Sequence, residues 1–366
     1  MDLIDKSKSN IVIRLDASKE IGLGHLVRCL NLIKVFPDIY NYIFVIRKSE
    51  EQTEIIDLIK NSRYSVILLS ESLTLIEDIA QTNSLIQGHG AVAFINDLIT
   101  YDCLNYSDYI YKYTKAIKKQ NTSCITITFG DSRIINYYCD LVIIQNEIRE
   151  NSETNYNNKL GIVLYGSKYL ISHPNYQNID IANRVIRSKA KNIVISIGGS
   201  DPFKLTNKLV ETLSLMKGVC VRVLIGLNRS QEDRAFFKKI ESESPFIKFL
   251  EFTENVGEEL YNADVAIVGE GNIKFEAALT GTPSLLITQF DHNSDPINYF
   301  REQNVSVYAG RGDNYDGRQF LAILIGLMNN KEKRKELSGY GLAKYTSNGA
   351  ENIYKEFIKP LIEKTI

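Results

Sequence analysis

Residues 11–30 read IVIRLDASKEIGLGHLVRCL, and residues 193–213 read IVISIGGSDPFKLTNKLVETL. Each stretch begins with a short run of Ile and Val, passes through a turn that contains glycine, and continues into an amphipathic segment. A short β-branched run that is apolar on both sides is typical of a strand buried in a parallel sheet. The two stretches therefore predict two successive α/β domains, each opening with a strand, a glycine turn and a helix.

The same alternation of strand and helix continues outward from both stretches. The expected strands are Ile11–Leu15, Tyr42–Ile46, Val66–Leu69, Ala91–Ile95, Cys124–Phe129 and Leu141–Ile144, then Ile193–Ile197, Val221–Ile225, Ile247–Leu250, Val265–Val268, Ser284–Ile287 and Val305–Tyr308. The expected helices are Leu26–Phe36, Glu51–Lys60, Leu73–Leu85, Lys204–Met216, Asp233–Glu241, Ile273–Leu279 and Arg318–Met328. Strands that alternate with helices predict parallel sheets covered on both faces.

A segment rich in Asn, Ser and Tyr, Asn151–Asn183, separates the two series and marks the expected domain boundary. We expect a first domain over residues 1–175 and a second over residues 176–350. Residues 351–366 are expected to form a C-terminal helix, interrupted by Pro360, that packs back on the first domain. Two doubly wound sheets would turn their carboxyl ends toward a shared cleft, since ligands of open α/β sheets bind at those ends.

The composition excludes several classes of function. The chain of 366 residues has 43 Lys and Arg against 44 Asp and Glu, and neither half has the basic surplus of a nucleic-acid-binding protein. No apolar run is long enough to span a membrane, and the first ten residues do not resemble a secretory signal. The five cysteines form no CxxC pair, so free thiols and a cytoplasmic location are expected, with Cys29, Cys124 and Cys220 buried. No cluster of His, Cys and carboxylates has the spacing of a metal site.

The first glycine turn carries the residues most suited to catalysis. His25 is expected at the start of a helix, where the positive end of the helix dipole disfavours a further positive charge. The imidazole should therefore be a neutral base that can take a proton from water. Gly22 and Gly24 would let a ligand approach the backbone closely, Asp16 could orient the imidazole, and Arg28 lies one turn further on. The alternative is a helix-start histidine whose neighbouring glycines serve only the turn.

Two further glycine turns, in the second half, are suited to binding a nucleotide. Gly198, Gly199 and Ser200 lie between a strand and a helix, where backbone N–H groups can bind a diphosphate. A second turn follows the strand Val265–Val268 and comprises Gly269, Glu270, Gly271 and Asn272. Glu276 would lie one turn into the next helix and could accept hydrogen bonds from ribose hydroxyls. Alternatively, it is only an acidic residue favoured near a helix N-terminus.

Several polar side chains elsewhere are expected along the same sheet edges. Asp97 follows a strand and could hold a sugar hydroxyl, and His292 is an alternative acid or base. The remaining candidates for substrate binding are Asn146, Tyr169, Gln289 and Asn293.

Four blocks carry a resemblance to a known family. They are RLDASKEIGLGHLVRCLNL (14–32), CDLVIIQNE (139–147), ISIGGSDPFKLTNKLVETL (195–213) and VGEGNIKFEAALTGTPSLLI (268–287). Together they resemble the UDP-2,4-diacetamido-2,4,6-trideoxy-β-L-altropyranose hydrolases of pseudaminic acid synthesis and the related spore coat polysaccharide biosynthesis proteins. Less closely, the chain is similar to the UDP-N-acetylglucosamine transferase of lipid II synthesis. The resemblance implies a GT-B-like fold, in which two Rossmann-like doubly wound domains face a central cleft.

The resemblance also implies a reaction and roles for individual residues. It makes His25 the catalytic base, assigns the two glycine turns of the second half to the diphosphate, and assigns Glu276 to the ribose. The implied reaction is the metal-independent hydrolysis of a UDP-activated sugar, with inversion and without a cofactor. The implied partners are the UDP-sugar substrate and other enzymes of the same sugar pathway. An inverting GT-B glycosyltransferase and a catalytically silent UDP-sugar-binding protein are the alternatives.

The chain departs from the family pattern at two places. Residues 170–176, LISHPNY, stand where a Leu-Leu-Arg-Pro-Glu-Phe-like run is expected after Tyr169. Residues 270–274, EGNIK, replace a Gly-Gly-Ser-Thr-like run in the second nucleotide turn. The two departures bear on sugar specificity and on the contacts to the diphosphate.

Overall fold

A computed structural model of the chain describes residues 4–18, 21–50, 52–98, 106–130, 136–146, 156–198, 201–226, 230–251, 253, 255–289 and 295–365. The chain forms two compact units. Unit 1 consists of residues 1–171 together with 348–366, and unit 2 consists of residues 172–347. The expected boundaries were 175/176 and 350/351, so the structure divides the chain a few residues earlier at both places.

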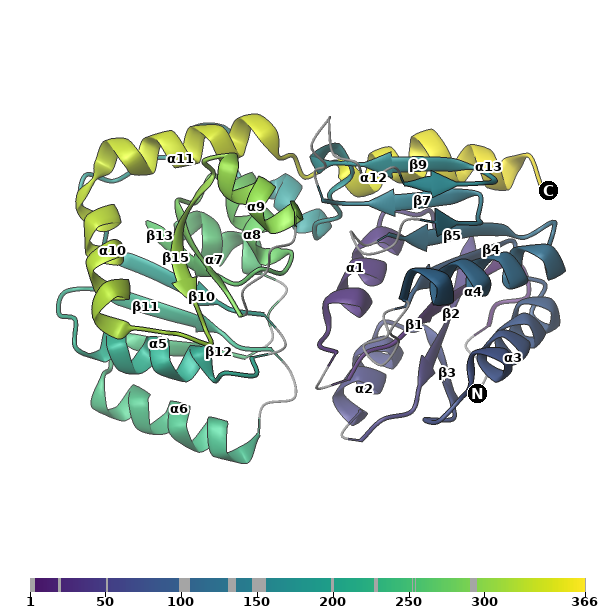
Figure 1. Ribbon diagram of the computed structural model, residues 1–366, viewed down its shortest axis with the longest axis horizontal. Coiled ribbons are helices and arrows are strands. Elements are labelled where there is room, and N and C mark those ends of the chain that lie inside the picture. Colours follow the sequence, from purple (N-terminus) through teal and green to yellow (C-terminus); the bar gives the residue numbers. More distant parts are fainter. Residues whose placement is uncertain are drawn as a thin grey trace. The chain divides into compact units, whose positions relative to one another are not determined.

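Unit 1 is built on a seven-stranded parallel sheet in the order β3-β2-β1-β4-β5-β7-β9 (Figure 1). Its strands are β1 (Ser9–Leu15), β2 (Tyr40–Arg47), β3 (Ser65–Leu69), β4 (Ala93–Asp97), β5 (Ile125–Phe129), β7 (Leu141–Ile144) and β9 (Ile162–Tyr165). The two-residue strands β6 (Asn136–Tyr137) and β8 (Asn157–Asn158) pair separately. The central strands are buried along nearly their whole length because helices cover both faces of the sheet.

The helices of unit 1 are α1 (Gly24–Ile33), α2 (Thr53–Asn61), α3 (Leu75–Gly88) and α4 (Tyr106–Gln120), followed at the end of the chain by α12 (Gly349–Ile353), a π-helical turn (Tyr354–Ile358) and α13 (Lys359–Glu363). Helices α3 and α4 pack on one face of the sheet through Ile86 and Ile110, which contact the core around Val12 and Phe94. The C-terminal segment returns to contact α1. Pro360 occupies the second position of α13, so the π-helical turn, rather than the proline, interrupts the terminal helix.

Unit 2 repeats this plan with a six-stranded parallel sheet in the order β12-β11-β10-β13-β14-β15. Its strands are β10 (Asn192–Ser196), β11 (Cys220–Leu224), β12 (Ile247–Leu250), β13 (Val265–Val268), β14 (Ser284–Thr288) and β15 (Ser306–Arg311). Its helices are α5 (Leu205–Ser214), α6 (Gln231–Glu243), α7 (Val256–Asn262), α8 (Ile273–Leu279), α9 (Asp295–Glu302), α10 (Gly317–Asn329) and α11 (Lys331–Lys344). Side chains from α5, α6 and α10 form one core with β10 and β11.

The strand order places the glycine turns where open α/β sheets in general bind ligands. In unit 1 the first strand, β1, lies between β2 and β4, and in unit 2 β10 lies between β11 and β13. The direction of winding reverses at these points, and the crevice outside the carboxyl ends of the strands there is where open α/β sheets bind ligands. The glycine turns at residues 16–24 and 197–201 follow β1 and β10, so each turn begins at such a point.

The predicted fold class, two doubly wound α/β domains, is confirmed, and every expected strand and helix has a counterpart. The elements that the sequence pattern did not predict are strands β6, β8 and β9 and helices α4, α7, α9 and α11. Cys29, Cys124 and Cys139 are buried free thiols, whereas Cys220 is exposed because it starts β11 on the outward side of an alternating strand. Cys103 lies outside the described residues. Among the helices of the described segments, none has the length and apolar character needed to cross a bilayer.

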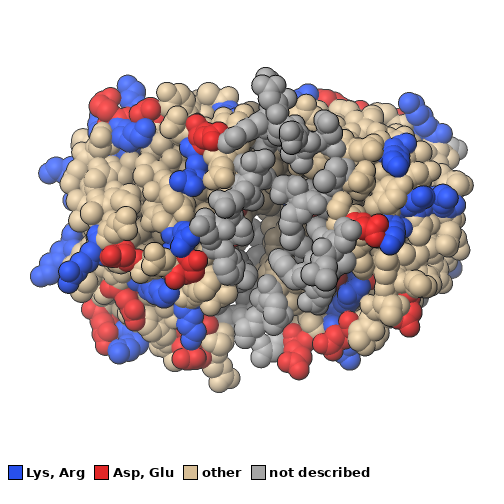
Figure 2. Space-filling model, in the orientation of Figure 1, with Lys and Arg blue, Asp and Glu red and all other residues tan. Residues whose placement is uncertain are grey.

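On the face drawn in Figure 2, basic and acidic side chains are intermixed over both units. This distribution agrees with the formal net charge of −1.

One of the nucleotide-turn glycines is required by the fold itself. The backbone N–H of Gly269 donates to the carbonyl of Ser196 at 3.0 Å, and a Cβ added at Gly269 would lie 2.2 Å from the carbonyl oxygen of Ile197. The ends of β10 and β13 can therefore meet only if residue 269 has no side chain. A Cβ at Gly271, by contrast, would have no heavy atom within 4 Å.

This difference predicts that two alanine substitutions two residues apart will lower stability by very different amounts. Gly269→Ala should lower the free energy of unfolding by more than about 2 kcal/mol, because backbone atoms have to move. Gly271→Ala should change it by no more than roughly 0.5 kcal/mol. Urea denaturation of the two variants measures the difference, and equal stability losses would contradict the assignment.

Candidate functional site

The first glycine turn joins the end of β1 to the start of α1. Gly22 has a φ of 81°, which favours glycine, and its N–H donates to the carbonyl of Ser18 at 2.8 Å, closing the loop. Helix α1 begins at Gly24, where an added Cβ would have no heavy atom within 4 Å. His25 is thus the second residue of the helix, at the carboxyl edge of the sheet, beside open space.

His25 is held by a carboxylate from the neighbouring strand. Its Nδ1 lies 2.8 Å from Oδ1 of Asp97, the last residue of β4. Asp97 is 1% exposed, whereas the His25 side chain is 18% exposed. The contact occupies Nδ1, so Nε2 is the ring nitrogen left for a ligand. A carboxylate in this position fixes the orientation of the ring and stabilises the imidazolium that forms when the ring takes a proton.

Arg28, one helical turn after His25, binds the same carboxylate through two nitrogens. Its Nε donates to Oδ2 of Asp97 at 2.9 Å, and its Nη2 donates to Oδ1 at 2.5 Å. Nη1 donates to Oε1 of Gln145 at 3.4 Å, and the guanidinium lies 4.6 Å from the centre of the Phe129 ring. A two-point arginine–carboxylate contact fixes geometry as well as charge. The cluster therefore joins α1 to the carboxyl ends of β4, β5 and β7.

The charges of the cluster settle the ionisation of Asp97. Burial raises the pKa of this carboxyl, but Arg28 and His25 outweigh that effect and lower the pKa to about 2. The neighbouring thiol behaves in the opposite way: burial and the charge of Asp97 raise the pKa of Cys29, whose Sγ lies 3.7 Å from Oδ2. Asp97 is therefore a carboxylate at neutral pH and Cys29 a protonated thiol, which makes a thiolate nucleophile unsuited to this site.

The structure gives Asp16 a different role from the expected one. Its Oδ1 accepts hydrogen bonds from Arg14 at 2.5 Å and from the backbone N–H of Arg47 at 3.1 Å. Arg14 is completely buried and also binds Asp78, so it needs both carboxylates as counter-ions. Asp16 therefore does not orient the imidazole. Asp97, expected to hold a sugar hydroxyl, contacts it instead.

Two other candidates of unit 1 lie apart from the His25 contacts. Oε1 of Gln145, and not its partly buried neighbour Asn146, accepts the hydrogen bond from Arg28. Tyr169 packs its ring edge-on against Phe357 of the C-terminal segment, with the ring centres 6.0 Å apart. Sequence reasoning overlooked Phe129 altogether. Its position at the carboxyl end of a buried strand is the signal that would have indicated it.

In unit 2 the two glycine turns differ in whether the start of the following helix is capped by a side chain. Gly198 has a φ of 109° and would have no atom within 4 Å of an added Cβ. The start of α5, however, is already capped, because the Asp201 carboxylate accepts from the N–H groups of Leu205 at 2.7 Å and Thr206 at 2.8 Å. The start of α8 has no side-chain cap at Asn272. Gly199, Ser200, His292 and Asn293 lie outside the described residues.

A buried lysine, Lys274, binds the backbone of the turn at Gly269–Asn272. Nζ of Lys274 donates to the carbonyls of Glu270 at 2.6 Å and Gly271 at 3.2 Å, and it lies 3.9 Å from the centre of the Phe275 ring. Burial lowers the pKa of Lys274 to about 7, although the charge of Glu270 acts in the other direction. Sequence reasoning assigned this residue no role. By binding two carbonyls, Lys274 fixes the shape of the turn.

Two polar side chains complete the candidate site of unit 2. Oε2 of Glu276 on α8 accepts a hydrogen bond from the hydroxyl of Tyr176 at 2.9 Å. Gln289 follows β14 and is 6% exposed, yet neither atom of its amide group has a hydrogen-bond partner among the described residues. An unpaired buried amide costs free energy, so its presence at the carboxyl end of a strand favours a ligand-binding role.

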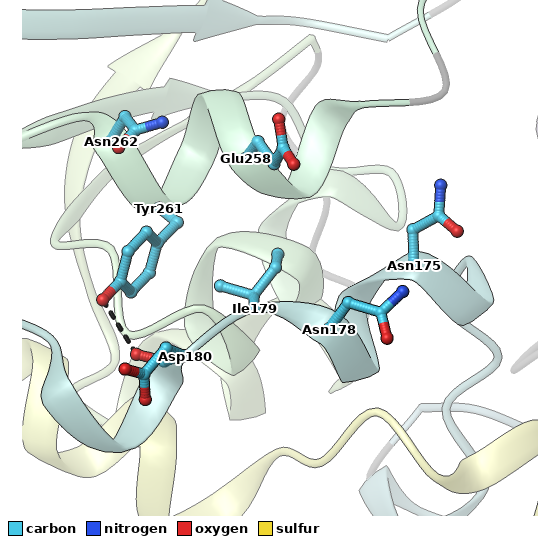
Figure 3. A pocket seen from close by; sticks show the side chains of 7 residues that line it. All are labelled: Asn175, Asn178, Ile179, Asp180, Glu258, Tyr261 and Asn262. Atoms are coloured by element: carbon cyan, nitrogen blue, oxygen red, sulfur yellow. Dashed lines mark hydrogen bonds between the residues drawn. The ribbon is translucent and has the colours of Figure 1, made fainter.

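A cavity of about 410 Å³ lies elsewhere on unit 2, between the 3₁₀ helix at Pro174–Asn178 and α7 (Figure 3). Its wall is polar and apolar in about equal parts, and the hydroxyl of Tyr261 donates to the carbonyl of Asp180 at 2.8 Å. The lining residues are Asn175, Asn178, Ile179, Asp180, Glu258, Tyr261 and Asn262. None of them belongs to the cluster around His25 or to the turn and side chains around Glu276, so the cavity is separate from both candidate sites.

The lowered pKa of Asp97 predicts an acid-dependent loss of stability. A carboxyl whose pKa falls on folding stabilises the fold above its unfolded pKa of about 3.8, and this contribution disappears as the pH falls toward about 2. Asp97→Asn should therefore be less stable than wild type at neutral pH and should lose less stability across that acidic window. Urea unfolding at a series of pH values measures this. Asp57→Asn, at an exposed position on α2, is the matched control, and identical pH slopes for wild type and Asp97→Asn would contradict the assignment.

Comparison with known proteins places this geometry in context. No family model matches the chain. It is 28% identical over 289 residues to an uncharacterized protein of Methanocaldococcus jannaschii, which covers 76% of this chain and 55% of that protein. It is 26% identical over 221 residues to the spore coat polysaccharide biosynthesis protein SpsG of Bacillus subtilis, covering 59% of this chain and 63% of SpsG. The chain thus spans between about half and two thirds of the length of these relatives.

Solved structures match over nearly the whole chain. MurG of Acinetobacter baumannii superposes with a TM-score of 0.62 at 12% identity, covering 96% of this chain and 99% of MurG. S. aureus MnaA in complex with UDP superposes with a TM-score of 0.57 at 12% identity, covering 98% of both chains. At such identities the likeness concerns the fold. The chain therefore has the GT-B fold of glycosyltransferases and epimerases and is a distant relative of SpsG.

Proposed function

We propose that the protein is an enzyme that binds a UDP-activated sugar, such as an acetamido-deoxy sugar, and hydrolyses it to UDP and free sugar with inversion. The proposed setting is nonulosonic acid or surface polysaccharide biosynthesis. The observation that carries this proposal is the cluster of His25, Asp97 and Arg28 at the carboxyl edge of the first sheet. A partly exposed imidazole backed by a buried carboxylate that is ionised at neutral pH is suited to act as a general base.

In the proposed reaction a water molecule attacks the anomeric carbon. Nε2 of His25 takes a proton from the water, while Asp97 holds the Nδ1 side of the ring and stabilises the imidazolium. A bond forms between the water oxygen and the anomeric carbon, and the bond from that carbon to the diphosphate breaks. UDP leaves with the electron pair of that bond. Because UDP is a good leaving group, a second carboxylate acting as general acid is not required, in contrast to ordinary glycosidases.

The relatives support the class of substrate. SpsG is by name a protein of spore coat polysaccharide biosynthesis, and the MnaA structure contains UDP. In this chain we assign the ribose hydroxyls to Glu276 and a sugar or phosphate oxygen to the unpaired amide of Gln289. The diphosphate is assigned to the backbone at Gly198 and at the turn through Gly271. The first N–H groups of α5 are excluded from this role because Asp201 already binds them.

The reaction can be tested with purified protein and a panel of UDP-activated acetamido sugars, in the presence of EDTA and without an acceptor. Release of UDP together with free sugar of inverted anomeric configuration, followed by NMR, is the expected result. UDP binding without release would favour a transferase that lacks its acceptor or a silent binding protein. A requirement for metal would contradict the scheme.

The role of His25 predicts a separation of catalysis from binding. His25→Asn should lower kcat by roughly a hundredfold or more, the usual contribution of a general base, and should leave UDP affinity within about twofold of wild type. His89→Asn is a matched control, since His89 caps the C-terminus of α3 ahead of β4, at the opposite sheet edge. Turnover assays and calorimetry on both variants measure the effect. Loss of UDP binding in His25→Asn would contradict the assignment of His25 as the general base.

A further inference from the structure

Tyr176 is buried at the beginning of unit 2 and has a specific partner. It lies in the 3₁₀ helix η2 (Pro174–Asn178) and is 1% exposed. A tyrosine buried to this degree needs a partner for its hydroxyl. The hydroxyl donates to Oε2 of Glu276, a residue distant in sequence, at 2.9 Å.

Helix α7 holds the Tyr176 ring in place. A Cβ added at Gly257 would lie 2.9 Å from Cε1 of Tyr176 and 2.7 Å from Cδ1 of Ile179. Glycine at position 257 therefore lets the α7 backbone pack directly on the ring. Because α7 also contacts α8, the tyrosine is fixed against the helix that carries Glu276. This packing holds the tyrosine ring beside the carboxylate.

The electrostatics of Glu276 depend on this contact. Burial raises the pKa of Glu276, and the hydrogen bond from Tyr176 lowers it, with a net raised pKa. Several charged groups on the surrounding elements have partners elsewhere, and Glu258 on α7 lines the cavity beside Asn175. Lys274 binds carbonyls of its own turn, Glu259 on α7 pairs with Arg222, and on α11 Arg334 donates to backbone carbonyls and Lys344 binds Gln303. Tyr176 is thus the titratable side chain, among those described, that acts on Glu276.

We propose that Tyr176 is a positioning residue for nucleotide recognition: it holds one oxygen of Glu276, so that the other oxygen accepts hydrogen bonds from the ribose hydroxyls of a uridine diphosphate. This inference rests on the proposed function and adds to it the group that sets ribose recognition. An acidic residue near a helix start would otherwise have several rotamers available. The hydrogen bond from the packed Tyr176 hydroxyl favours one of these rotamers in the unliganded protein, so less side-chain entropy is lost when the ligand binds.

Calorimetry with UDP and 2′-deoxy-UDP tests the inference. The proteins compared are wild type, Tyr176→Phe, Glu276→Gln and the double variant. Tyr315→Phe is the matched control, because Tyr315 is a half-buried tyrosine of the same unit whose hydroxyl donates to Thr212 at 3.0 Å. Wild type should prefer UDP. Tyr176→Phe should bind UDP roughly tenfold more weakly and show a reduced preference over 2′-deoxy-UDP. The same change made on top of Glu276→Gln should have little further effect.

The pH dependence provides a second readout that a purely structural role would not change. UDP binding should weaken as Glu276 becomes protonated in acid. Since the Tyr176 hydroxyl lowers the pKa of Glu276, its removal should move this weakening to higher pH. An unchanged pH midpoint, or an equal loss for both nucleotides that persists in the Glu276→Gln background, would overturn the inference. Failure of the proposed function has a different signature: wild type itself would not bind UDP, or would not distinguish it from 2′-deoxy-UDP.

Discussion

The site of unit 1 depends on one buried carboxylate. Asp97 is removed from water at the end of a central strand, and a charge in such a place has to be neutralised by a partner that also satisfies its oxygen atoms. Arg28 donates to both oxygens of the carboxylate, and Nδ1 of His25 contacts Oδ1 as well. The same electrostatic requirement that holds α1 against β4 therefore also determines where the imidazole lies. Structure and proposed catalysis share a single interaction.

The glycine turn before α1 is anchored at both of its ends by such charges. At its start, Asp16 is bound to Arg14 and to the backbone of Arg47, within a buried network that includes Asp78. At its end, His25 and Arg28 are bound to Asp97. Between these two anchors the chain contains the glycines that close the loop and leave space above it.

The fold was accessible from sequence because each strand is a short run of Ile and Val and each junction with a helix carries a glycine or polar signal. The partner of His25 could not be predicted in the same way. Asp16 is only nine positions from His25 along the chain and was therefore the expected partner. The actual partner, Asp97, ends β4, and the strand order places β4 beside β1. Periodicity does not reveal which strands are neighbours. Lys274 was overlooked for a related reason: a lysine in the first turn of a helix is normally solvated, and only the packing, with the Phe275 ring centre 3.9 Å from Nζ, shows that it is buried. Strand β9 is the short apolar run IVLY inside the Asn-rich segment, which was interpreted as a domain boundary.

The return of the C-terminus to unit 1 has a consequence for how the chain folds during synthesis. Unit 2 is one continuous segment, residues 172–347, inserted into unit 1, whose last part, residues 348–366, is made after unit 2. Phe36 stacks on Tyr354 with ring centres 4.3 Å apart, and the backbone at Gly349 lies directly against that of Leu170. Domains generally fold as units, so the second unit can fold from its own continuous segment, whereas the first needs residues from both sides of it. The order of folding would then be the reverse of the order in which the two sheets begin.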